Sequence, residues 1–234
     1  MADRISVIIP ALDEQDYIRY ALDGLRKQSM RNFETIVVDG GSSDRTVSIA
    51  KSFANVITCR KRGTGRARNM GARKATGNIL LFIDADTKPS PKLLETYSGI
   101  FSCRDIVAAT GPIYPIDSNN FWIRKGYEFV SVFLVRLSIL VGRPAIVGSN
   151  FAVRASKFRA AGGFDESLMT YEDWALSNKI KKYGKVEYSK KAVVHTSARR
   201  IKSWGIFGYV AFYLTDAIMY KFTGRSRKMY EIVR

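Results

Sequence analysis

The sequence predicts an α/β protein, in which a mostly parallel central sheet carries helices on both faces and is followed by a basic and aromatic C-terminal helix. Three observations lead to this fold class. Apolar, β-branched runs alternate with helical patterns through the first half of the chain. Polar residues follow directly after those runs, where parallel sheets bind their ligands. The last part of the chain is rich in aromatic residues and is flanked by basic ones.

The first half contains strand and helix patterns in alternation. Strands are expected at residues 5–10, 33–38, 55–58 and 79–83. A helix is expected at residues 14–27, where Ile18, Leu22 and Leu25 lie on one stripe, and another at residues 66–75. Strands that alternate with helices in this way predict parallel pairing, with helices on both faces of the sheet.

The second half is less regular. Further elements are expected as a strand at residues 151–154, a helix at 172–183 and a last strand at 193–194. In that helix, Leu176, Ile180 and Tyr183 are expected to face inward. Residues 127–141 are apolar, but Arg136 interrupts them, and they are too short and too polar to predict a membrane span.

The C-terminal segment differs in character from the rest of the chain. Residues 204–220 are rich in aromatic residues, and Asp216 is their only ionisable side chain apart from tyrosines. Basic residues flank them: Arg199, Arg200, Lys202, Lys221, Arg225, Arg227 and Lys228. We expect residues 1–200 to form one domain and residues 201–234 to form a helix, either at a membrane interface or packed in the protein or a dimer. The net charge favours the membrane slightly.

The composition excludes several classes of protein. The 234 residues carry 38 Lys+Arg against 21 Asp+Glu, a formal charge of +17, and 46% are hydrophobic. Disordered, collagen-like and disulfide-scaffold proteins have other compositions. The positive charge attracts polyanions such as nucleic acid, phosphate-rich substrates or an anionic membrane. A start without a signal-peptide pattern, and two cysteines expected in the core, predict a cytoplasmic protein, peripheral on the inner face of the membrane if the tail binds there.

The most informative local pattern is Asp84-Ala85-Asp86, directly after the apolar run at residues 79–83. Two carboxylates that leave a buried strand one residue apart can bind a hard divalent cation, and this cation can hold a diphosphate. The alternative is that both are solvated turn residues, as aspartates at strand ends usually are.

Further motifs accompany this pair in a defined order. They are Pro10-Ala11-Leu12-Asp13-Glu14, Asp39-Gly40-Gly41-Ser42-Ser43-Asp44, Gly65-Arg66-Ala67-Arg68-Asn69-Met70-Gly71 and Glu172-Asp173. Together they resemble glycosyltransferase family 2, and the resemblance extends to about residue 200 through Gly148-Ser149-Asn150, Gly162-Gly163-Phe164-Asp165 and His195. It implies the GT-A fold, a UDP- or GDP-sugar donor, a divalent cation (Mn²⁺ or Mg²⁺) and transfer with inversion at the anomeric carbon.

The resemblance also implies roles for single residues on the donor side. The backbone at Pro10 and Ala11 and the side chain of Asp39 would hold the base and ribose, with Glu14 near the nucleotide. Gly40 stands where the family often has a second aspartate. The metal ligands would be Asp86, with Asp84 close to both metal and ribose, and His195.

On the acceptor side, Asp173 matches the general base of the family and Glu172 is its neighbour, while Gly148, Ser149 and Asn150 would bind the acceptor. An in-line displacement needs one carboxylate to accept the proton of the attacking hydroxyl and one cation to stabilise the departing diphosphate. The alternatives are an acidic pair favoured by a helix dipole at residues 172–173 and a structural role for His195.

Two pairs of arginines are candidates for contacts with phosphate. Arg66 and Arg68 begin a predicted helix, where they either meet phosphate oxygens of the nucleotide sugar or form a solvated face. Arg199 and Arg200 follow His195 and either reach a leaving diphosphate or begin a membrane-facing patch.

The acidic pair at residues 172–173 favours a hydroxyl acceptor, on a sugar or a lipid-linked glycan. A polyprenyl phosphate is the alternative acceptor, because an ionised phosphate oxygen needs no base. A non-catalytic nucleic-acid-binding protein is the alternative from another class, but basic charge does not require carboxylates at three strand ends, so no nucleic acid is expected.

Overall fold

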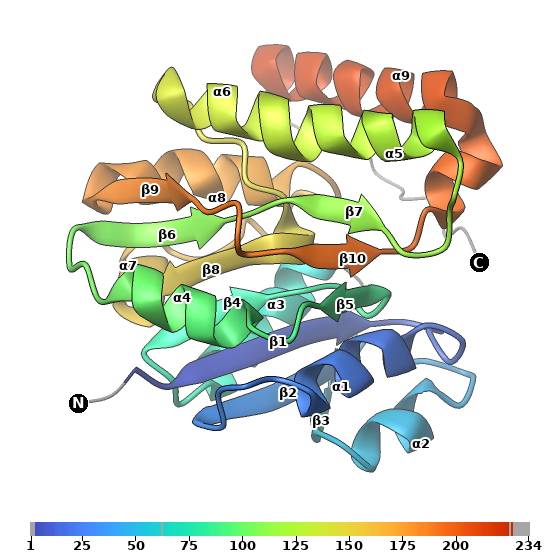
Figure 1. The fold of residues 1–234 in the computed structure, drawn as a ribbon, viewed down its shortest axis with the longest axis vertical. Coiled ribbons are helices and arrows are strands. Elements are labelled where there is room, and N and C mark those ends of the chain that lie inside the picture. Colours follow the sequence, from blue (N-terminus) through green and yellow to red (C-terminus); the bar gives the residue numbers. More distant parts are fainter. Residues whose placement is uncertain (1–2, 62, 225, 227–234) are drawn as a thin grey trace.

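The computed structural model describes residues 3–61, 63–224 and 226, except for the side chains of residues 213, 214, 217 and 221. Its centre is a seven-stranded sheet in the order β3-β2-β1-β4-β8-β6-β9 (Figure 1). The four strands of the first half are β1 (Ile5–Ala11), β2 (Phe33–Asp39), β3 (Asn55–Thr58) and β4 (Ile79–Phe82). All of them pair in parallel, as predicted.

The second half completes this sheet with three strands, β6 (Ile106–Thr110), β8 (Phe151–Arg154) and β9 (Lys185–Tyr188). β8 runs antiparallel to both β4 and β6, whereas β9 is parallel to β6. The sheet is therefore mostly parallel, with one reversed strand in its interior. β8 was expected at these residues, but β6 and β9 were not predicted.

A small second sheet consists of three short strands, β5 (Thr87–Pro89), β7 (Ile113–Pro115) and β10 (Val194–Thr196). β10 lies between the other two, antiparallel to β5 and parallel to β7. This arrangement places Thr196 opposite Thr87, so the end of the chain returns to the residues that follow Asp86.

Helices cover both faces of the central sheet (Figure 1). They are α1 (Ile18–Arg26), α2 (Thr46–Lys51), α3 (Thr64–Lys74), α4 (Leu93–Phe101), α7 (Ala155–Ala160) and α8 (Glu172–Ile180), with 3₁₀ turns at Gly148–Asn150 and Lys181–Tyr183. α1 begins four residues later than predicted, and residues 15–17 form a turn in which the backbone N–H groups of Tyr17 and Ile18 donate to the carbonyl of Glu14. The prediction that Tyr183 faces inward was wrong: it is exposed in the last 3₁₀ turn.

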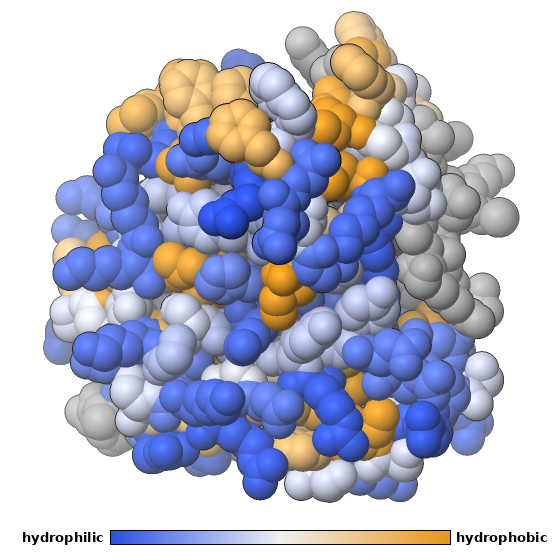
Figure 2. Space-filling model, turned by 45° about the vertical axis from the view of Figure 1, so that its right-hand side comes forward, coloured by the Kyte–Doolittle hydropathy of each residue, from blue (hydrophilic) through white to orange (hydrophobic). Residues whose placement is uncertain are grey.

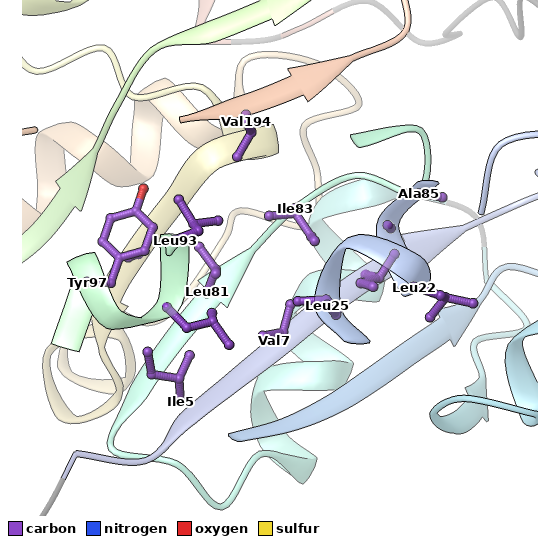
Figure 3. Packing of buried hydrophobic residues seen from close by; sticks show 14 of the residues in the cluster. Ile5, Val7, Leu22, Leu25, Leu81, Ile83, Ala85, Leu93, Tyr97 and Val194 are labelled. Atoms are coloured by element: carbon purple, nitrogen blue, oxygen red, sulfur yellow. The ribbon is translucent and has the colours of Figure 1, made fainter. Parts of the chain in front are cut away.

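The hydrophobic core lies on both faces of the sheet, because successive residues of β1 and β4 point to opposite sides. One cluster joins Val7 and Leu81 to Leu22 and Leu25 of α1 (Figure 3). The other joins Ile8 and its neighbours to α3, α7 and α8. Cys59 is buried in the second cluster as expected, whereas Cys103 is exposed.

Two long helical segments lie side by side above the sheet (Figure 1). The first comprises α5 (Phe121–Glu128), a π-helical stretch (Phe129–Leu134) and α6 (Val135–Leu140). The second is α9 (Arg199–Thr223), which is kinked at Gly205, where φ is 69°. The predicted boundary at residue 200 falls in the first turn of α9, and residues 225 and 227–234 of the tail lie outside the described residues. Within the part of the chain that the structure describes, no helix is long and apolar enough to cross a membrane.

Candidate active site

The carboxyl ends of β1, β2 and β4 meet at one edge of the sheet, and three polar loops follow them. The register of β1 and β2 places Ala11 beside Asp39, and the backbone N–H of Gly40 donates to the carbonyl of Ala11 over 2.8 Å. Pro10, also predicted at this edge, pairs with Val38 one step earlier. The predicted convergence of these strand ends is thus present in the fold.

Two carboxylates shape the first two of these loops. The buried Asp39 side chain accepts hydrogen bonds from the backbone N–H groups of Gly41 (3.0 Å) and Ser42 (3.1 Å). Asp13, whose φ of 52° is unusual for this residue type, accepts from the backbone N–H of Ser43 over 2.8 Å. Hydrogen bonds therefore connect the loop after β1 to the loop after β2.

A buried arginine connects the loop after β4 to the start of α8. Arg68, only 3% exposed, donates from Nη1 to Oε1 of Glu172 (2.7 Å) and from Nη2 to Oδ1 of Asp84 (2.8 Å). Burial alone would lower the pKa of this guanidinium, but the carboxylates of Asp84, Glu172 and Asp173 raise it above its ordinary value. Arg68 is thus a fixed positive charge among three carboxylates.

The acidic pair of α8 occupies two different environments. Glu172 is held by Arg68, whereas Asp173 accepts hydrogen bonds from the backbone N–H of Gly148 at Oδ2 (2.7 Å) and of Trp174 at Oδ1 (2.8 Å). Burial raises the pKa of Asp173 above its ordinary value. Burial and the neighbouring Asp173 raise the pKa of Glu172 to about 7. The two bonds fix the orientation of the Asp173 carboxylate and leave each oxygen a further acceptor position.

A second arginine joins the loops after β1 and β4 to the beginning of α9. Arg199 binds the carboxylate of Glu14 with both Nη atoms, over 2.8 and 2.5 Å, and its Nη2 lies 3.3 Å from Oδ2 of Asp86. The hydroxyl of Thr196 donates to Oδ1 of Asp86 over 3.2 Å. Burial and the nearby Asp84 raise the pKa of Asp86 to about 6 in spite of Arg199.

The chemistry of Asp84 and Asp86 fits a divalent cation. Both are carboxylates, the ligand type that Mg²⁺ and Mn²⁺ prefer. The anionic form of Asp86 is disfavoured by burial, by Asp84 and by Glu14, and a cation bound between the carboxylates would remove this penalty.

The structure does not bring His195 to these carboxylates. Thr196 contacts Asp86, and successive residues of a strand point to opposite sides, so His195 points away from it. Its ring lies 6.0 Å from that of Tyr114, and burial together with Lys88 and Arg124 lowers its pKa. Among the described residues there is no group of three or more His, Cys, Asp or Glu that could hold a metal ion. The arrangement of β10 does not support His195 as a third ligand, and this role stays a prediction from the sequence.

Other predicted site residues have structural partners. Arg66 points to Glu166, with 3.0 Å between Nη1 and Oε2. The buried Asn150 accepts a hydrogen bond from the hydroxyl of Tyr97 (2.6 Å) and donates one to the carbonyl of Ala192, so its amide is engaged in the core.

In the same turn as Asn150, Ser149 is buried, and Gly148 allows the close approach of Arg68, because a Cβ at this glycine would lie 2.5 Å from the guanidinium nitrogens. Of the three predicted acceptor residues, Gly148 is the one in contact with the acidic cluster.

Sequence reasoning did not assign a role to the two arginines that organise the site. The sequence predicts that Arg66 binds the nucleotide sugar, but the arginine that enters the cluster is Arg68. For Arg199, the sequence leaves contact with phosphate and a membrane-facing patch as alternatives. A helical-wheel argument gives a signal for Arg68: it lies on the same side of α3 as Gly71, which packs against β1, with Ile8 close enough to clash with a Cβ there.

Comparisons with known proteins agree with this arrangement. The model of "Glycosyl transferase family 2" matches residues 6–162. GlyA of Streptococcus pneumoniae, a glycosyltransferase, is 29% identical over 147 residues, which cover 56% of this chain and 21% of that protein. An uncharacterized glycosyltransferase of Rickettsia typhi is 25% identical over 198 residues, covering 81% of this chain and 62% of that one. The chain thus spans less than two thirds of these relatives.

Solved structures show the same fold. TarS of S. aureus in complex with UDP-GlcNAc is similar with a TM-score of 0.70 at 20% identity, over 84% of this chain and 59% of that one. The mannosyltransferase PcManGT of Pyrobaculum calidifontis, in complex with GDP-Man and Mn²⁺, gives a TM-score of 0.71 at 21% identity, over 92% and 65%. The sheet, its covering helices and these neighbours confirm the GT-A fold. With its family model matched over most of the sheet and its motifs gathered at one edge of it, this chain belongs to glycosyltransferase family 2.

Proposed function

We propose that the protein is an inverting, metal-dependent glycosyltransferase that moves a sugar from a UDP- or GDP-sugar to a hydroxyl group, on a sugar or a lipid-linked glycan. The observation that carries this proposal is the partly buried Asp173 carboxylate, which two backbone N–H groups orient beside the Arg68 cluster. One structural neighbour is a complex with UDP-GlcNAc and another is a complex with GDP-Man. Both support a nucleotide-sugar donor, and either uridine or guanosine is compatible with them.

On the donor side, Asp86 and Asp84 would hold the cation, which supplies positive charge to the diphosphate oxygens. The loops after β1 and β2, with Pro10, Ala11 and Asp39, would hold the base and ribose. Arg199 lies beside Asp86, so its guanidinium is positioned to meet a diphosphate as well.

On the acceptor side, Asp173 would take the proton of the attacking hydroxyl. The hydroxyl oxygen then forms a bond to the anomeric carbon, while the bond from this carbon to the diphosphate breaks on the opposite face, which inverts the configuration. Glu172 is less suited to this role, because Arg68 already occupies its carboxylate at 2.7 Å. The raised pKa of Asp173 makes it a better proton acceptor than an exposed aspartate.

The first test is calorimetric binding of UDP, GDP and their sugar conjugates, with and without Mn²⁺. We expect one nucleotide to bind with the metal, and Asp86→Ala to abolish this binding. Glu95→Ala is the control, because Glu95 is an exposed carboxylate on α4 that accepts a hydrogen bond from Ser29 outside the cluster. Absence of metal-dependent binding in the wild type would refute the proposed donor.

The second test concerns the acceptor. Asp173→Asn is isosteric, keeps the acceptor oxygen for one backbone bond and removes the base, so transfer to a hydroxyl should fall by about 10²–10⁴-fold. If Asp173→Asn transfers normally while Asp86→Ala is inactive, the acceptor is an ionised group such as a polyprenyl phosphate.

A further inference from the structure

The outer surface of the segment from α5 to α6 is apolar. α5 has no buried residue, and Trp122 and Leu140 are 70% and 80% exposed. Between them, the rings of Phe129 and Phe133 stack with their centroids 5.4 Å apart, and each residue is 55% exposed. Monomeric soluble proteins seldom expose large side chains contiguously unless the surface has a function.

The orientation of this segment is fixed by polar contacts on its inner side. The buried Ser131 hydroxyl donates to the carbonyl of Ile113 (3.0 Å) and accepts from its backbone N–H (3.1 Å). The Tyr127 hydroxyl donates to the carbonyl of Ser197 over 3.2 Å. The apolar residues therefore point outward as a consequence of specific contacts with β7 and with the turn between β10 and α9.

The neighbouring helix α9 continues this surface. Phe207, immediately after the kink at Gly205, is 92% exposed, and Val210 is exposed one turn later. The two helical segments lie along the same upper edge in Figure 1, and Figure 2 shows orange side chains gathered at that edge. We define the α5–α9 face by Trp122, Phe129, Phe133, Leu140, Phe207 and Val210.

The charges around the α5–α9 face identify what it contacts. Between residues 121 and 143, the basic side chains Arg124, Lys125, Arg136 and Arg143 are all exposed, and the only acidic residue is Glu128. Aromatic and aliphatic residues rimmed by Lys and Arg match the interface of an anionic bilayer. Two copies of the face would bring their positive charges together, which disfavours self-association. A nucleic acid would pair with the basic residues but would leave the apolar side chains exposed to water.

We propose that the α5–α9 face docks on the headgroup region of an anionic lipid bilayer. The sequence suggested membrane contact for the tail alone; the face adds the α5–α6 segment as an equal part of the contact. Resting on the proposed function, this docking would hold the site close to a lipid-linked acceptor, because α9 begins at Arg199, which contacts Glu14 and Asp86.

The test is sedimentation of the full chain with vesicles of phosphatidylcholine, alone or mixed equally with phosphatidylglycerol. We expect the wild type to pellet with the mixed vesicles only. The double variant Phe129→Ser, Phe133→Ser should bind at least about tenfold more weakly, because two apolar rings no longer leave water. Tyr20→Ser on α1 is the matched control, an exposed aromatic residue outside the face.

The outcomes are separable from folding and from catalysis. Both positions are exposed, so the double variant should keep the wild-type melting temperature and the nucleotide affinity. Equal pelleting of the wild type and the double variant overturns the proposal, as does a wild type that stays in solution with both vesicle types. A wild-type dimer that the double variant converts to a monomer, without vesicle binding, would assign the face to self-association instead.

Discussion

Replacement of Arg68 by leucine tests whether one buried cation holds the acidic cluster together. The Arg68 side chain is almost fully buried between Glu172, also buried, and Asp84, which is partly exposed. Removing one partner of a buried pair costs about 3–5 kcal/mol, because the other charge stays behind without compensation. Asp84 remains solvated, so most of this cost comes from Glu172.

The expected loss of stability depends on pH. The folded-state pKa of Glu172 is about 7, above its ordinary value of 4.5, so the native state favours the protonated carboxyl, and stability is lost as pH rises from about 4.5 through 7. Without Arg68, the folded-state pKa rises further, which makes the ionised form still less favourable. The difference between Arg68→Leu and wild type should therefore be largest at pH 8 and shrink toward pH 5.

Thermal and urea unfolding at both pH values measure this effect. At about 2–4 °C per kcal/mol for a chain of this size, Arg68→Leu should lower Tm by roughly 6–20 °C at pH 8. Arg66→Leu, on the same helix but in an ion pair with partly exposed partners, should cost less than about 1 kcal/mol. Equal losses for the two variants, or an Arg68→Leu effect that does not change with pH, would refute the reasoning.

Three further changes probe the site and the contact of α9 with it. Asp86→Asn should abolish metal-dependent nucleotide binding in calorimetry. In urea unfolding without metal, the same variant should be about 1 kcal/mol more stable than the wild type, because a buried charge beside Asp84 is removed. Loss of stability would contradict this reasoning. Gly148→Ala should displace Arg68 and reduce transfer, and it should lower the free energy of unfolding by about 1–3 kcal/mol. Its control, Gly99→Ala in α4, meets open space and should stabilise by about 0.5–1 kcal/mol. Thr170→Val removes a hydrogen bond to Asp216, so it should lower the free energy of unfolding by about 1.5–3 kcal/mol and should also lower kcat. Its control, Thr215→Val on the exposed side of α9, should change neither quantity.

The sequence was sufficient for the parts of the fold that are specified locally. β1, β2 and β4 have contiguous apolar runs, and their carboxyl ends carry the predicted polar residues. The three strands of the second sheet have only three residues each, too few to show a period. β10 was expected at residues 193–194 from two valines, but its place between β5 and β7 depends on strands about 107 and 81 positions earlier in the chain, respectively.

The arrangement within the site was less predictable, because the decisive contacts join distant segments. Arg68 and Glu172 are separated by 104 positions, and Arg199 and Glu14 by 185. Both arginines look like solvated charges in their local sequence, and only the packing of α3 and α9 buries them. Conversely, Asn150 looked like a ligand residue in its motif, but its amide is engaged with Tyr97 and Ala192.

The contacts of α9 make this helix part of the candidate site as well as a candidate membrane element. Its first residue, Arg199, forms ion pairs with Glu14 and Asp86. Further along the helix, the buried Asp216 accepts a hydrogen bond from the hydroxyl of Thr170, in the loop that leads to Asp173. α9 thus contacts the loops after β1 and β4 at its first residue and the loop before α8 further along. Deletion of residues 201–234 keeps Arg199 but removes Asp216, so activity should fall even for an acceptor in solution, whereas substitutions at exposed residues of the α5–α9 face test membrane binding alone.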